Sequence, residues 1–156
     1  PTLAAKKALE IPEGDSRDDA IDSVAESMHR ANPADAAAWV VANGSEKAQR
    51  DSMRNVIGNW VGQDPSAAKA WAVAQPEGDL RDSAVSSFVM SDNTGSPAEN
   101  IQLAETISDE RSRGWSIGMT TMRWMGEDPK AASSYLESSE FIDEGMKKRI
   151  LGRSGR

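Results

Sequence analysis

The segment DPSAAKAW, residues 64–71, decides the fold because its first two residues mark a repeat. Prolines recur every 32 residues, and each internal one directly follows Asn, Asp or Ser. These residue types are favoured helix N-caps, and Pro is favoured at the first helical position, so each pair predicts the start of a helix. The marked positions are Pro1, Asn32-Pro33, Asp64-Pro65, Ser96-Pro97 and Asp128-Pro129.

The residues between these prolines also keep phase. A small residue stands three positions after the proline in four of the five units, as at Ala68, and a large apolar residue stands six positions after it in four of five, as at Trp71. Turn-forming sequence then follows, with PEGD at 12–15 and 76–79 and NGSE at 43–46. A second run of periodic apolar residues comes next. Each unit is therefore predicted to be two helices joined by a short turn.

This pattern predicts an all-α protein. A period of 32 residues suits helical hairpins that stack on their neighbours, so we expect a right-handed superhelix, an α-solenoid of about five 32-residue hairpins. We expect residues 1–156 to form a single domain. The predicted units are approximately residues 1–31, 32–63, 64–95, 96–127 and 128–156.

The repeat also carries a resemblance to known sequences. The pattern DPxAAxxW followed by PxGxxRDxA resembles a group of uncharacterised bacterial helical-repeat proteins. The resemblance covers essentially the whole chain and implies an α-solenoid of tetratricopeptide or HEAT-like type, with no implied activity. It is carried by Asp64, Pro65, Ala67, Ala68, Trp71, Pro76, Gly78, Arg81, Asp82 and Ala84.

Charge is unevenly spread along the chain. Residues 1–110 contain 9 Lys or Arg against 19 Asp or Glu, a net charge of −10, whereas residues 111–156 contain 9 against 6, a net charge of +3. An acidic body argues against nucleic acid as a partner and is compatible with a basic protein or peptide. No run approaches the roughly 18 apolar residues that span a membrane. The compartment stays open between cytoplasm and periplasm, with any targeting segment outside these residues.

The residue inventory argues against catalysis. The chain has no Cys and a single His, which removes thiolate metal sites and most triad chemistry. There is no Gly-rich phosphate loop after a strand and no nucleophile elbow. We therefore expect no enzyme activity, no metal and no cofactor.

An acidic face is predicted on the second helix of the first unit. Its members, spaced to lie on one side of a helix, are Asp15, Asp18, Asp19, Asp22 and Glu26. One interpretation is a cation site or a docking surface for a basic segment. The other is favourable charge near a helix N-terminus that also aids solubility.

An apolar stripe breaks the repeat in the fourth unit. Trp115, Met119 and Met122 occupy one face of the predicted helix, at phases that are polar or small in the first two units. Three interpretations are open. The fifth unit covers the stripe as a cap, a second copy of the chain covers it, or it grips a partner, for which Trp and adaptable Met are well suited.

Two further features bear on the joints between units. Arg17, Arg81 and Arg113 share one phase, and repetition favours a structural hydrogen bond or ion pair to a neighbouring loop. The segment MSDNTGSP, residues 90–97, replaces the Trp-bearing helix end of the second unit. It predicts an early helix end and a looser joint.

In solenoids, repeated apolar positions bind neighbouring units and unrepeated surface residues carry function. The first hypothesis is therefore a non-enzymatic protein- or peptide-binding scaffold, with the apolar stripe as anchor and the acidic face as electrostatic guide. The alternative is a structural spacer or regulatory segment of a larger envelope or signalling protein, with no ligand of its own.

Overall fold

The computed structural model describes residues 2–154, and these form ten α-helices and no strand, which confirms the all-α class. Each predicted unit holds two consecutive helices. The helices are α1 (Thr2–Glu10), α2 (Asp15–His29), α3 (Pro33–Asn43), α4 (Glu46–Gln63), α5 (Pro65–Ala74), α6 (Asp79–Ser91), α7 (Pro97–Ala104), α8 (Glu110–Glu127), α9 (Pro129–Ser138) and α10 (Glu144–Ser154).

The predicted caps head the first helices of the units. Asn32, Asp64 and Asp128 each accept a hydrogen bond from the backbone N–H three residues later, with Pro at the next position. Ser96 is the exception, because its side chain makes no capping hydrogen bond. Its φ of −64° differs from the −138° to −151° of the other three caps. The sequence signal is thus correct for the helix start and wrong for the cap bond at Ser96.

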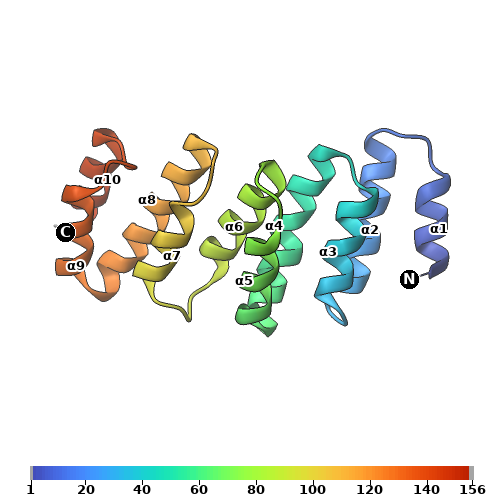
Figure 1. Ribbon diagram of the computed structural model, residues 1–156, viewed down its shortest axis with the longest axis horizontal. Helices are drawn as coiled ribbons and strands as arrows, with labels where there is room; N and C mark the ends of the chain where they lie inside the picture. Colours follow the sequence, from blue (N-terminus) through green and yellow to red (C-terminus); the bar gives the residue numbers. More distant parts are fainter. Residues whose placement is uncertain (1, 155–156) are drawn as a thin grey trace.

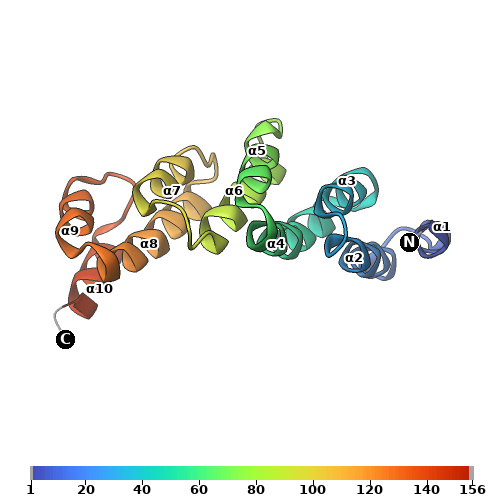
Figure 2. The same ribbon diagram turned by 90° about the horizontal axis from the view of Figure 1, so that it is seen from below.

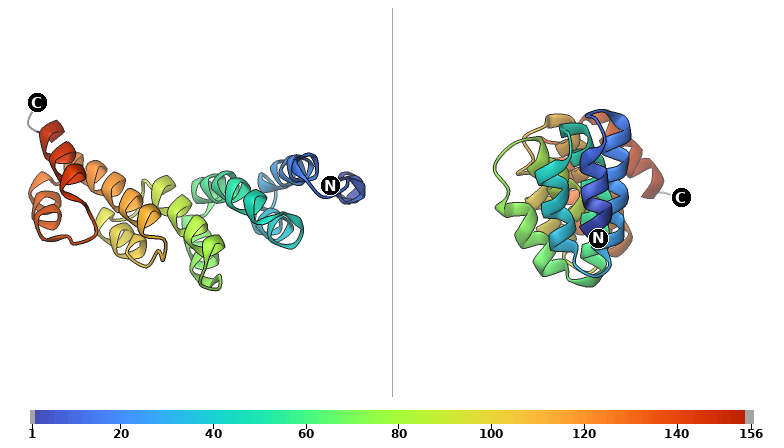
Figure 3. Two further views of the ribbon diagram at one scale, coloured as in Figure 1. Left: turned by 90° about the horizontal axis from the view of Figure 1, so that it is seen from above. Right: turned by 90° about the vertical axis from the view of Figure 1, so that its right-hand side faces the viewer.

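The hairpins follow one another along the long axis of the molecule, with α1 and α10 at opposite ends (Figure 1). The second helix of each hairpin contacts the next in order, α2 with α4, α4 with α6, α6 with α8 and α8 with α10. Helices α3, α5 and α7 lie along one side of this row, and α2, α4 and α8 along the other (Figure 2). Seen from the N-terminal end, the helices overlap in a narrow bundle from which α10 projects (Figure 3). Within residues 2–154, no helix has both the length and the apolar character that crossing a membrane requires.

Aromatic pairs join some of the hairpins. Trp60 near the end of α4 packs on Trp71 of α5, and Trp124 of α8 packs on Tyr135 of α9, with ring centres 6.2 Å apart in each pair. The small residue three positions after the repeated proline is fully buried beside these joints, as at Ala68. Small side chains let the helices approach closely, so the repeated positions form the core.

The joint between α6 and α7 is built differently. Helix α6 has 13 residues whereas α4 and α8 have 18 each, so the predicted early end is present. The buried carboxylate of Asp92, 4% exposed, accepts hydrogen bonds from Thr94, from the N–H of Gly95 and from the side chain of Asn100. Burial raises the pKa of Asp92, but these hydrogen bonds outweigh burial and hold that pKa below 3.8. The expected looser joint is therefore a loop held by a buried polar network.

Candidate functional site

An open hollow of about 1120 Å³ lies over α6, where α4, α8 and the segment before α10 surround it. We call it the groove. Helix α6 contributes Ser86, Ser87 and Ser91 to its lining. These side chains are small, whereas the lining residues Arg54 of α4 and Arg111 and Trp115 of α8 are large, so the surface over α6 stays hollow. A groove on one side of the molecule results.

Large apolar side chains gather at the α8 end of the groove. Trp115 is 54% exposed, Phe141 42% and Met90 36%, and all three line it together with Met146. Single exposed apolar residues are ordinary on protein surfaces, whereas several that line one hollow mark a binding surface. These four residues come from α6, α8, the loop before α10 and α10 itself.

Two glycines of α8 bring the last hairpin onto this helix. A Cβ atom at Gly114 would lie 3.3 Å from the carbonyl oxygen of Phe141, and one at Gly118 would lie 3.2 Å from Cγ of Met146. Contacts this short leave no room for a larger side chain without a shift. The glycines therefore let residues 141–146 pack on α8 and place Phe141 and Met146 in the groove lining beside Trp115.

Arg113 supports the same wall. Its Nη1 donates to the carbonyl oxygen of Ile107 at 2.9 Å, and its guanidinium carbon lies 5.4 Å from the centre of the Phe141 ring. Arg81, at the same phase, donates to the carbonyl and hydroxyl oxygens of Thr106 in the next hairpin. The structural role predicted for the repeated arginines is confirmed at these two positions. Arg113 also orients an aromatic ring of the groove.

The start of α8 forms the polar part of the wall. Asp109 caps α8 by accepting from the N–H of Ser112 at 2.7 Å, and hydrogen bonds from Ser112 hold the pKa of Asp109 below 3.8. The backbone N–H groups of Ser108 and Asp109 in turn donate to the carboxylate of Asp82 on α6, at 3.0 and 2.8 Å. Asp82 is buried, so it fixes α8 against α6 rather than presenting its charge to the groove.

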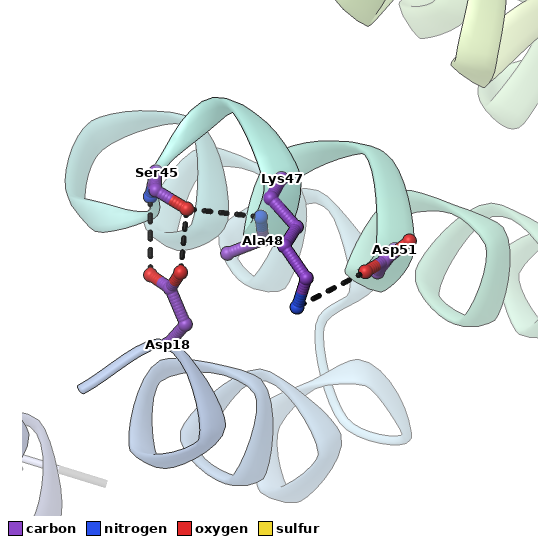
Figure 4. Close-up of polar contacts among 5 residues, drawn as sticks. All are labelled: Asp18, Ser45, Lys47, Ala48 and Asp51. Atoms are coloured by element: carbon purple, nitrogen blue, oxygen red, sulfur yellow. Dashed lines mark hydrogen bonds and ion pairs between the residues drawn. The ribbon is translucent and has the colours of Figure 1, made fainter. Parts of the chain in front are cut away.

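Asp18 joins α2 to the start of α4 in the way that Asp82 joins α6 to the start of α8. Asp18 lies on α2, and its carboxylate accepts hydrogen bonds from the backbone N–H of Ser45 at 3.3 Å and from the Ser45 hydroxyl at 2.5 Å (Figure 4). Ser45 itself caps α4 through the N–H of Ala48. The close-up also shows the exposed pair Lys47–Asp51, 3.7 Å apart on α4. Asp18 is therefore committed to the joint between α2 and α4.

The remaining members of the acidic face behave as surface charges. Asp15, Asp19 and Glu26 are exposed on α2, and Asp22 is half-buried. Within residues 2–154, no three His, Asp or Glu side chains are grouped as a metal site would need. The structure thus places all five on α2, commits Asp18 to the joint with α4, and does not draw the other four to a shared centre.

The apolar stripe is divided by the structure. Trp115 lines the groove, whereas Met119 and Met122 are half-buried and lie outside the groove lining, Met122 against the core. The last hairpin packs on the neighbouring Gly114 and Gly118 and leaves more than half of Trp115 exposed. Trp115 therefore lines the groove with residues of other elements and without the other two members of the stripe.

The sequence reasoning missed Met90, Phe141 and Met146. A signal was present in Gly114 and Gly118, four residues apart on one helix, which is the spacing of a close helix approach. The loop that carries Phe141 gives no such local signal. No protein family, curated protein or solved structure matches the chain.

Proposed function

We propose that this chain is a non-enzymatic scaffold that binds a linear segment of another protein in the groove. We further infer that its hairpins form a right-handed α-solenoid of tetratricopeptide or HEAT-like type. The ordered contacts of α2, α4, α6 and α8 along one row support this architecture, because each hairpin of a solenoid contacts its neighbours in sequence.

One observation carries the binding proposal, namely the cluster of Trp115, Phe141 and Met90 around an open hollow of about 1120 Å³. Anchors of protein interfaces are enriched in Trp and sit in pockets from which water is displaced. Trp115 supplies a large rigid surface, and Met adapts to the shape of a partner. Burial of these side chains by a partner removes apolar surface from water, which is the main driving force of association.

A display library of short random peptides tests the proposal. We expect the native chain to enrich a set of peptides that the double variant Trp115→Ala, Phe141→Ala no longer retains. Val73→Ala is the matched control, because Val73 on α5 is equally exposed and lies outside the groove lining. Far-UV circular dichroism checks that all three proteins keep their helices. Peptides kept equally by all three, or no enrichment at all, would refute binding in the groove.

Self-association is a distinct outcome of the same surface. Sedimentation velocity over a range of concentrations separates the two, because a second copy on Trp115 gives a dimer that Trp115→Ala abolishes. We expect a monomer, since the proposal leaves the groove open to a partner.

The spacer alternative rests on the extended row of hairpins, in which α1 and α10 lie at opposite ends (Figure 1). A spacer needs this extension and no ligand. It predicts that no peptide is enriched and that the Trp115 variants behave like the native chain in every binding assay.

A further inference from the structure

We propose that the segment bound in the groove pairs a large apolar side chain with an adjacent Lys or Arg. This proposal rests on the proposed function, because it names the chemistry of the partner at the same site. It is argued from the charges that surround Trp115 and Phe141.

The groove carries more negative than positive side chains. Four carboxylates line it, those of Asp109, Glu110, Glu140 and Asp143, against the two guanidinium groups of Arg54 and Arg111. The surface around the apolar centre is therefore acidic, as is the chain as a whole with its net charge of −7.

Two of the four carboxylates already have hydrogen-bond partners within the chain. Asp109 and Asp143 accept backbone hydrogen bonds at the starts of α8 and α10. Glu110 and Glu140 are exposed, and among the described residues neither side chain has a hydrogen-bond or ion-pair partner. These two carboxylates stand on the same wall of the groove as Trp115 and Phe141 and are open to a cation.

Binding of a partner would remove water from the carboxylates of the groove. An apolar side chain that covers Trp115 removes water from its surroundings, and carboxylates that lose water without a counter-ion disfavour binding. A Lys or Arg beside the apolar side chain supplies that counter-ion and also speeds encounter with an acidic surface. An acidic segment meets like charge on the same wall and is rejected.

The position of Arg54 gives the bound segment a direction. Arg54 lies on α4, whereas the unpaired carboxylates belong to α8 and the loop before α10. The cation of the partner therefore lies beside Glu110 and Glu140, away from Arg54, on a wall that also carries Arg111 of α8. Arg113 already stands over the ring of Phe141, which leaves the ring of Trp115 to receive the partner's apolar group.

Selection from the random-peptide library, repeated on two charge variants, tests this inference. Glu110→Lys, Glu140→Lys reverses the two free carboxylates of the groove. Glu127→Lys, Glu137→Lys makes the same change in net charge at exposed positions outside the groove lining. For a peptide selected on the native chain, we expect the groove variant to lose about tenfold in affinity and the control to lose little.

Each outcome decides a separate question. Enriched peptides that combine an apolar residue with Lys or Arg, retained by the control and lost by the groove variant, support the inference. Peptides that depend on Trp115 but carry no excess of Lys or Arg overturn it and leave the proposed function standing. Equal loss on both charge variants assigns the preference to the charge of the whole chain and also overturns it. No peptide that depends on Trp115, or a Trp115-dependent dimer, overturns both proposals.

Discussion

Two joints in the same row of hairpins solve one packing problem in different ways. Where α4 meets α5, Trp60 faces Trp71 with ring centres 6.2 Å apart, and Ala68 is fully buried beside them. Where α6 meets α7, the repeat positions of Trp60 and Ala68 are held by Asp92 and Asn100, which are joined by a hydrogen bond of 3.0 Å. The two positions have changed together, from an apolar pair to a polar one.

The two kinds of joint differ in how strictly they fix the geometry between helices. Apolar packing tolerates small changes of angle, whereas a buried carboxylate requires every donor around it to stay in place. Asp92 also ends α6, and Arg123 of α8 donates to the carbonyl oxygen of Val89 at 3.1 Å near that end. Met90 and Ser91, the last two residues of α6, line the groove. The polar joint therefore fixes the edge of the candidate site.

The largest effect is expected at the apolar joint. Trp60→Ala removes a buried ring that packs on Trp71, so the free energy of unfolding should fall by about 3 to 5 kcal/mol. Urea unfolding followed by far-UV circular dichroism measures it. Trp115→Ala is the control, because that ring is 54% exposed and its loss should cost no more than about 1 kcal/mol. Equal losses in the two variants would show that the ring pair does not hold the joint.

Substitutions at the polar joint should lower the free energy of unfolding by nearly as much, and the effects of substitutions at Asp92 and Asn100 should be coupled. Asn100→Ala removes the donor to Oδ2 of the buried Asp92 carboxylate and should cost about 2 kcal/mol. Asp92→Ala should cost a similar amount. Because the two residues form one network, the double variant should lose less than the two single losses added together. Additive losses in this double-mutant cycle would mean that Asp92 and Asn100 act independently.

A third pair of variants compares the helix caps at the same two joints. Asp64 caps α5, so Asp64→Ala should lower the free energy of unfolding by about 1 kcal/mol. Ser96 heads α7 without a capping hydrogen bond, so Ser96→Ala should change it by less than about 0.5 kcal/mol. A loss at Ser96 as large as that at Asp64 would indicate a cap bond that forms in solution.

The helix starts were predictable because their signals are local. An Asn or Asp before Pro needs only the N–H three residues later, so Asn32, Asp64 and Asp128 act as the sequence indicates. Ser96 carries the same signal but follows a loop whose geometry is set by Asp92. The 32-residue period therefore predicted the helices better than it predicted every cap.

The candidate site was predictable only in part because it depends on contacts between distant residues. Trp115 broke the repeat and was found on that basis. Asp18 was grouped with its helical neighbours, although its partner Ser45 lies 27 residues away in the next hairpin. Phe141 and Met146 reach Trp115 through packing on Gly114 and Gly118, which no local pattern describes.

The smallest expected effect is a pH dependence of the free energy of unfolding that comes from the polar joint. The pKa of Asp92 lies below 3.8 in the folded chain, because hydrogen bonds from Asn100, Thr94 and Gly95 outweigh its burial. The charged carboxylate therefore stabilises the folded state above about pH 4, and this contribution is lost as the pH falls through the folded-state pKa. At the apolar joint, Trp60 holds the repeat position of Asp92. Native chain and Asp92→Asn should thus differ more in free energy of unfolding at about pH 6 than at about pH 3.

Asp19→Asn controls for the general loss of one negative charge, because Asp19 is exposed on α2 and far from this joint. If Asp92→Asn differs from the native chain by the same amount at both pH values, the joint is held by the shape of the side chain and not by its charge. A difference that narrows on acidification for Asp92→Asn but not for Asp19→Asn assigns the effect to the carboxylate. The edge of the groove would then depend on a buried carboxylate at the position that Trp60 holds in the apolar joint.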